Sequence, residues 1–88
     1  MMVQRQGDWL SARVGEELVM MSAQKGNYIG LSDVGARIWD LIETPLPLED
    51  ICVRLTAEFE VSPEVCRSEV EAFLAQLEEH GAVALDPA

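Results

Sequence analysis

The hydrophobic periodicity of the sequence changes once, at Ser32-Asp33, and this change limits the fold more than any other feature. Before it lie three β-rich runs with glycine-containing pairs between them: residues 8–14, 17–24 and 27–32, joined by Gly15-Glu16 and Lys25-Gly26. Short β-rich runs with such connections predict a meander of antiparallel hairpins. In the third run, period-two alternation places Ile29 and Leu31 on the core face and Tyr28 on the opposite face.

After Ser32-Asp33, apolar residues recur at helical spacing in three segments. Ser32 or Asp33 can cap the first helix, and Thr44-Pro45-Leu46-Pro47 ends it because proline donates no main-chain hydrogen bond. Pro47 can also occupy the first turn of the second helix. Ser62-Pro63-Glu64 begins the third helix, and His80-Gly81 ends it. The predicted apolar stripes are Val34, Ile38, Leu41 and Ile42, then Leu48, Ile51, Leu55 and Phe59, then Cys66, Val70, Phe73 and Leu77.

A run of strands followed by a run of helices is typical of an α+β domain. We therefore predict one domain over residues 1–88, a three-stranded antiparallel β-meander followed by three α-helices, similar to a winged helix-turn-helix. Val83 and Leu85 form a short final strand or fold under the domain. Trp39 is predicted to anchor helix to sheet, and Trp9 is either a core residue or a docking surface. The open sheet edge leaves strand exchange in a homodimer as an alternative.

Charge limits the partners of this domain. The chain carries 16 acidic and 6 basic residues, for a formal net charge of −10. Binding to nucleic acid needs clustered Lys and Arg, whereas the predicted third helix carries Arg67 among five glutamates. A winged-helix DNA-binding regulator is therefore the weaker alternative. The sequence shows no signal peptide and no apolar run long enough to span a membrane, so we expect a cytoplasmic protein without nucleic-acid or membrane partners.

Few side chains are suited to catalysis. His80 is the single histidine, and a position at a helix end favours a cation without implying chemistry. The glycines do not have the spacing of a phosphate-binding loop. Cys52 and Cys66 are interpreted as small buried hydrophobic residues, with a small redox or metal protein as the alternative. We predict that the chain is not an enzyme and has no cofactor.

The run GNYIGLSDVGARIWDLIETPLPLEDICVRLTAEFEVSPEVCRSEVEAFLAQLEEHGAV resembles the PqqD-like family. The shared pattern is a glycine and an aromatic residue before Leu31 and a small polar residue, then Gly35 with Ile38-Trp39, an apolar second helix ending in Phe59, and V-x-x-F-L-x-x-L-x-x-x-G from Val70 to Gly81. Members of this family are small domains that bind the leaders of ribosomally made, post-translationally modified peptides. They are also called precursor-peptide recognition elements. Tyr28, the Pro45/Pro47 pair and Cys66 make the stand-alone leader-binding protein of lasso-peptide biosynthesis the most similar variant.

The resemblance implies binding without catalysis. In this family the leader is added as a strand along the third strand, in the groove between that strand and the third helix. The implied partners are the precursor leader and a leader peptidase or another maturation enzyme. The alternatives to the lasso pathway are pyrroloquinoline quinone synthesis and other peptide-modification pathways. The peptide-binding residues that the resemblance implies are Asn27, Tyr28, Ile29, Gly30, Leu31, Cys66, Arg67, Val70, Phe73, Leu74 and Leu77.

The residues of the third helix in this set are not equivalent. Those on its apolar stripe would be core in any domain of this shape. Leu74 and Arg67 are expected one flank away from the stripe, which makes them the better candidates for peptide contact. If the other flank faces the groove, Glu69 and Gln76 take their place.

Overall fold

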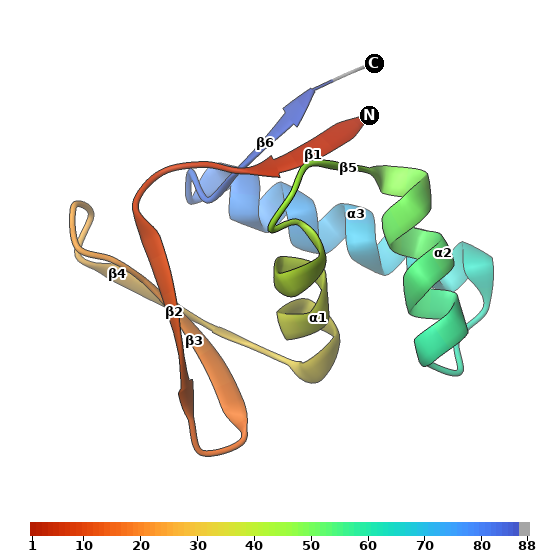
Figure 1. Cartoon of the computed structure of the whole chain (residues 1–88), viewed down its shortest axis with the longest axis horizontal. Helices are drawn as coiled ribbons and strands as arrows, with labels where there is room; N and C mark the ends of the chain where they lie inside the picture. Colours follow the sequence, from red (N-terminus) through yellow and green to blue (C-terminus); the bar gives the residue numbers. More distant parts are fainter. Residues whose placement is uncertain (87–88) are drawn as a thin grey trace.

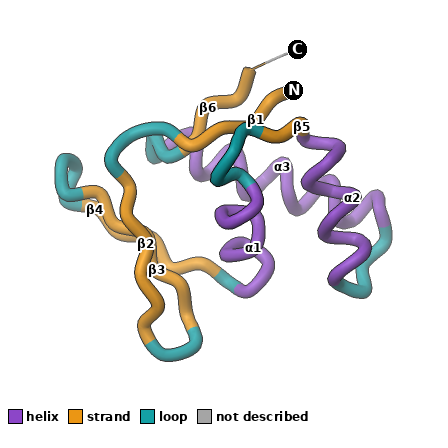
Figure 2. Tube along the Cα trace, in the orientation of Figure 1, coloured by secondary structure: helices purple, strands orange, loops and turns teal. Residues whose placement is uncertain are grey.

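The computed structural model describes residues 1–86 and contains two small sheets and three helices (Figures 1 and 2). Among these residues, no helix is long and apolar enough to cross a membrane. In chain order the elements are β1 (Met2–Arg5), β2 (Trp9–Val14), β3 (Glu17–Ser22), β4 (Asn27–Leu31), α1 (Asp33–Leu41), β5 (Leu46–Pro47), α2 (Leu48–Glu58), α3 (Pro63–Glu79) and β6 (Val83–Asp86).

The predicted meander is confirmed as the sheet β2-β3-β4, in which both pairs of neighbours are antiparallel. Gly15-Glu16 forms the two-residue turn between β2 and β3, and Gly15 has a φ of 66°, a conformation that glycine adopts without steric cost. Leu31 is buried on the inner face, as predicted. Ile29 is only half-buried, because its part of β4 borders a groove rather than the core.

The connection from β3 to β4 is longer than predicted, since β3 ends at Ser22 and not at residue 24. Asp8 explains the early end: its carboxylate accepts hydrogen bonds from the Ser22 hydroxyl at 2.6 Å and from the Gln24 N–H at 3.0 Å. The Gly26 N–H then donates to the Ser22 carbonyl at 2.8 Å. These bonds take the main-chain and side-chain groups that a longer hairpin ladder would use.

The second sheet, ordered β5-β1-β6, joins segments that are far apart in the sequence. Met2 pairs with both Pro47 and Asp86, so the two ends of the described chain lie side by side (Figure 1). The short final strand at Val83 and Leu85 is confirmed as β6. β1 and β5 were not predicted. Val3 anchors this sheet to the core with no exposed surface.

The helix boundaries follow the capping signals. The Ser32 and Ser62 hydroxyls accept from the Gly35 N–H at 3.2 Å and from the Val65 N–H at 3.3 Å, which satisfies one free donor in each first turn. His80 is the C-cap of α3, and Gly81 follows with a φ of 75°. Pro47 differs from the prediction: it precedes the first turn of α2 as its N-cap, because its main chain is extended and pairs with β1.

The core lies where α1 packs between the main sheet and the pair formed by α2 and α3 (Figure 1). Trp39 is 2% exposed and anchors α1, as predicted, and the Arg5 guanidinium stacks 4.2 Å from the centre of its ring. Trp9 is also a core residue. Its indole Nε1 has no hydrogen-bond acceptor, and its ring meets the His80 ring edge-on at 6.5 Å.

Candidate peptide-binding groove

Strand β4 forms one edge of the main sheet, because it pairs with β3 and with no other strand described in residues 1–86. Along its other side, the main-chain N–H and C=O groups of an edge strand are free to pair with an added strand. Asn27, Tyr28 and Gly30 are exposed on this strand, and Tyr28 is 77% exposed. The edge is therefore accessible over most of its length.

A groove of about 430 Å³ separates this edge from α3. Apolar side chains come from both walls, Ile29 and Leu31 from β4 and Phe73 and Leu77 from α3. Polar side chains line the groove beside them. The lining residues are Ile29, Gly30, Leu31, Ser32, Phe73, Gln76, Leu77 and His80. An extended segment in this groove would contact β4 on one side and α3 on the other.

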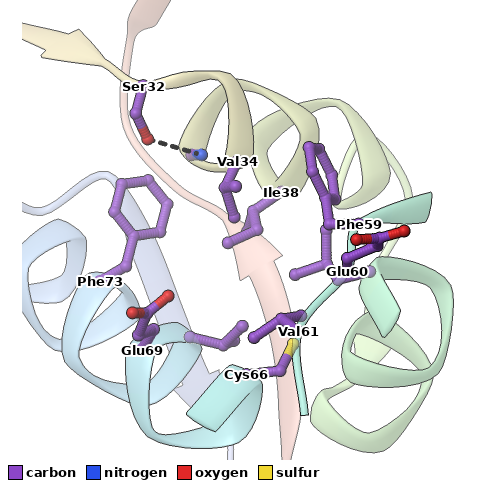
Figure 3. Close-up of a pocket in the computed structure, with 12 residues that line it drawn as sticks. Ser32, Val34, Ile38, Phe59, Glu60, Val61, Cys66, Glu69 and Phe73 are labelled. Atoms are coloured by element: carbon purple, nitrogen blue, oxygen red, sulfur yellow. Dashed lines mark hydrogen bonds between the residues drawn. The ribbon is translucent and has the colours of Figure 1, made fainter. Parts of the chain in front are cut away.

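The groove continues into a second, more apolar cavity of about 390 Å³ between α1, α2 and α3 (Figure 3). Ser32 and Phe73 line both cavities, so the two are neighbours. In Figure 3 the Ser32 and Phe73 side chains lie on one side of the opening and Phe59 and Glu60 on the other. The lining residues are Ser32, Val34, Gly35, Ile38, Leu55, Phe59, Glu60, Val61, Cys66, Glu69, Val70 and Phe73.

A close approach between α1 and α3 positions the Phe73 ring between these cavities. A Cβ on Gly35 would lie 3.1 Å from Phe73 Cε1 and 3.2 Å from Cζ, closer than ordinary van der Waals contact. Glycine at this position thus lets the ring pack directly on the first turn of α1. The absence of a side chain at residue 35 fixes where Phe73 lies relative to the groove.

The structure corrects the predicted orientation of α3. Leu74 is 1% exposed and lies on the buried stripe with Cys66, Val70 and Leu77. The expectation that Leu74 lies off this stripe is wrong, because the 4-4-3 spacing of these residues centres the stripe between Val70 and Leu77. Arg67 is exposed and points away from the groove, toward Glu71 at 3.7 Å.

The flank of α3 that faces β4 carries Phe73, Gln76 and His80, and Glu69 lines the adjoining cavity. This is the flank that the sequence offered as the alternative. His80, Ser32, Phe59 and Val61 were not predicted to line a site. Once the buried stripe is centred correctly, helical spacing predicts His80, because it lies one turn beyond Gln76 on the same flank. No local sequence pattern predicts that the Phe59 and Val61 side chains turn toward α1.

The two ends of the groove differ in charge. At the β3–β4 connection, the Lys25 ammonium donates to the His80 carbonyl at 2.8 Å. At the opposite end, Glu60 and Glu69 border the apolar cavity. Neither forms an ion pair within residues 1–86, where the ion pairs are Arg37–Glu58 at 2.8 Å and Arg67–Glu71. The hydrogen bond from Arg37 holds the pKa of Glu58 below its ordinary value.

The groove contains no recognisable catalytic arrangement. Cys66 is buried as predicted, and Cys52 is only half-buried; both are free thiols. Burial raises the pKa of the Cys52 thiol, which disfavours the reactive thiolate. No group of three His, Cys, Asp or Glu residues within residues 1–86 lies close enough to hold a metal ion. What the groove offers a ligand is an open strand edge, apolar surface and fixed charges.

Comparison with known proteins places this geometry in a family. The family model described as coenzyme PQQ synthesis protein D (PqqD) matches residues 17–83. One similar solved structure, TbiB1 in complex with the TbiA(beta) leader peptide, is 28% identical with a TM-score of 0.84, covering 97% of this chain and 99% of that one. Lasso peptide synthetase B1 complexed with the leader peptide is 22% identical with a TM-score of 0.83, covering 94% and 98%, and shows the shared fold.

No curated protein matched the chain. The family model nevertheless spans the main sheet from β3 onward, all three helices and the start of β6. It therefore includes every element that lines the groove. The chain belongs to the PqqD family.

Proposed function

We propose that this protein binds the leader region of a ribosomally synthesised precursor peptide as an added strand on β4 and presents it to a maturation enzyme. The observation that carries this proposal is the open β4 edge facing α3 across a groove that Ile29, Leu31, Phe73 and Leu77 line from both sides. The pathway we favour is lasso-peptide biosynthesis, with a leader peptidase as the enzyme. TbiB1, 28% identical over nearly the whole chain, was solved with a leader peptide, which supports leader binding.

Strand addition suits the dimensions of the site. β4 has five residues, enough for several main-chain hydrogen bonds to a partner strand. Side chains on one face of that strand would point into the groove toward Phe73 and Leu77. Where the strand passes Ser32, a large apolar side chain can enter the cavity of about 390 Å³. Burying one such side chain contributes roughly 1.5–3 kcal/mol.

The proposed peptide-contacting residues come from both walls of the groove. Leu77 lines the groove between these walls, and Cys66 and Val70 line the adjoining cavity. Leu74 is excluded because its side chain is 1% exposed, and Arg67 because it lines neither cavity. The β4 wall consists of Asn27, Tyr28, Ile29, Gly30 and Leu31, and the helical wall of Phe73, Gln76, His80 and Glu69.

The proposed role is delivery without catalysis. A leader held on β4 keeps the adjoining cleavage site close to an enzyme that binds the same protein, and this raises its effective concentration. Precursor peptides are made on ribosomes, so we place this step in the cytoplasm. The acidic exposed surface of α3 remains unsuited to DNA.

A fluorescence-anisotropy titration tests the proposal, using a labelled leader of the precursor encoded with this protein. We expect saturable binding at about micromolar or tighter, roughly −8 kcal/mol or better. Phe73→Ala should weaken it about tenfold or more, whereas Glu71→Ala, on the opposite flank of α3, should leave it unchanged. Thermal melts of both variants control for folding.

A second arm separates strand addition from other modes of binding. A leader synthesised with N-methyl groups on alternate residues keeps its side chains but loses main-chain donors on one edge. We expect one of the two N-methylated registers to lose binding. Equal binding of both registers, or no binding by the unmodified leader, would contradict the proposed function.

A further inference from the structure

A shallow pocket of about 450 Å³ lies beside the end of β4 that leads into α1. Three of its six lining residues are acidic: Glu16, Glu17 and Asp33, with Gly30, Leu31 and Ser32 completing the set. The pocket lies on the β3 side of β4 and shares Gly30, Leu31 and Ser32 with the proposed leader groove. A strand added to β4 would therefore pass both.

Glu17 reaches across the sheet to Gly30. Val19 is the residue of β3 paired with Gly30, and Glu17 lies two positions along on the same face. The Glu17 Oε2 atom lies 3.9 Å from the point that a Gly30 Cβ would occupy, and no other non-neighbouring atom lies within 4 Å of that point. The space above Gly30 is thus open, with a carboxylate at its border.

In the described part of the chain, the Glu17 carboxylate forms no ion pair. The ion pairs within residues 1–86 involve Glu58 and Glu71, and not the three acids of this pocket. The Arg13 guanidinium donates to the main-chain carbonyl of Glu16 at 3.5 Å and not to a carboxylate of this pocket. Lys25 lies at the opposite end of β4, beside His80. The negative charge is therefore concentrated at the end of β4 that leads into α1.

We infer that the bound strand places a lysine or arginine opposite Gly30, with its aliphatic stem over Gly30 and its charge at the Glu17 carboxylate. This inference rests on the proposed function, and it names a specificity determinant of the leader. Directly opposed residues in neighbouring strands have Cβ atoms about 4.5–5.5 Å apart, within reach of a long side chain. Lys and Arg commonly lay their stems on uncharged surface while the charge reaches a polar group.

Glu17→Gln tests the charge while keeping the side-chain shape. With the fluorescein-labelled leader of the precursor encoded with this protein, we expect about two- to fivefold weaker binding at low salt, the range for exposed ion pairs. The difference should shrink as added salt screens the pair. Glu78→Gln, one heptad beyond Glu71 on the flank of α3 opposite the groove, is the matched control for the general effect of net charge, and it should change binding little.

A double-mutant cycle identifies the leader residue. Each Lys and Arg of the peptide is replaced in turn by Gln, and each peptide is titrated against the wild type and Glu17→Gln. Exactly one basic residue should contribute to binding in the wild type and lose that contribution in Glu17→Gln. If every basic residue contributes equally in both proteins, the inference is wrong.

Gly30→Ala tests the stem. A methyl group meets no atom closer than 3.9 Å, and alanine in a strand loses less backbone entropy on folding than glycine, so the melting temperature should be unchanged or slightly raised. It should weaken binding of the wild-type leader, and unchanged affinity would contradict the placement of the stem. A wild-type protein that does not bind the leader refutes the proposed function and this inference together. Leader binding that Glu17→Gln leaves intact refutes this inference alone.

Discussion

Gly35→Ala is predicted to separate stability from binding. Alanine in a helix is favoured over glycine by about 1 kcal/mol. The new Cβ would lie 3.1 Å from Phe73 Cε1, 3.2 Å from Phe73 Cζ and 3.5 Å from the Ser32 hydroxyl oxygen, so the Phe73 ring must move by a few tenths of an ångström. Overpacking of this kind typically costs about 1–3 kcal/mol. The net change in the free energy of unfolding should therefore be a loss of about 0–2 kcal/mol.

The direction in which Phe73 moves decides the effect on binding. Its ring is half-buried and has the groove on its free side, so the displaced ring should enter the space that the leader occupies. We expect leader affinity to fall by about tenfold, close to 1.4 kcal/mol, while the protein stays folded. Urea unfolding followed by tryptophan fluorescence gives the stability, since Trp9 and Trp39 are both buried.

The double variant Gly35→Ala/Phe73→Leu is the control. A smaller side chain at residue 73 relieves the contact, so the two substitutions should be non-additive in the unfolding free energy. If Gly35→Ala instead gains about 1 kcal/mol of stability and binds the leader normally, the close packing of Phe73 on α1 does not position the groove wall.

Three further predictions follow from burial and charge. Leu74→Ala should lower the free energy of unfolding by about 2–5 kcal/mol, because the side chain is 1% exposed, and the fraction that remains folded should bind the leader normally; urea unfolding and anisotropy measure the two effects. Hydrogen bonds from the Ser22 hydroxyl and the Gln24 N–H lower the pKa of Asp8 below its ordinary value of 3.8. These bonds therefore stabilise the folded protein above pH 3.8, and the stabilisation is lost as the pH falls through the lower pKa of the folded state. Urea unfolding of wild type and Asp8→Asn should therefore differ at pH 6 and converge in acid. Burial raises the pKa of the Cys52 thiol, so iodoacetamide should alkylate Cys52 in the native protein more slowly at pH 8 than it alkylates free cysteine. The buried Cys66 should react only after unfolding, and mass spectrometry measures both reactions.

Local signals explain what could be predicted of the fold. Ser62-Pro63-Glu64 begins α3, and Gly15-Glu16 makes the first hairpin turn, because capping and turn chemistry depend on adjacent residues. The second sheet escaped prediction because its pairs are non-local. Met2 pairs with Pro47 and with Asp86, and a four-residue strand with two exposed positions has no clear alternation.

The candidate site was predictable on its strand side and not on its helical side. Strand order alone makes β4 an edge. The facing flank of α3 depends on the exact centre of its buried stripe, and the Phe73 ring lies at the border of that stripe. The predicted stripe had Phe73 at its centre and Leu74 at its edge. That placement turned the Leu74 flank of α3 toward β4, whereas the structure has the Phe73 flank there. The adjoining apolar cavity depends on Val61 in the α2–α3 connection, which has no periodic pattern to locate it.

Amide hydrogen exchange of β4 with and without the leader tests the central claim most directly. Unpaired edge amides exchange rapidly, and an added strand supplies their missing acceptors. At saturating leader, we predict slower exchange for the outward-facing amides of Asn27 to Leu31, with little change in the N–H groups that already pair with β3. Saturable leader binding that leaves β4 exchange unchanged would contradict strand addition at this edge.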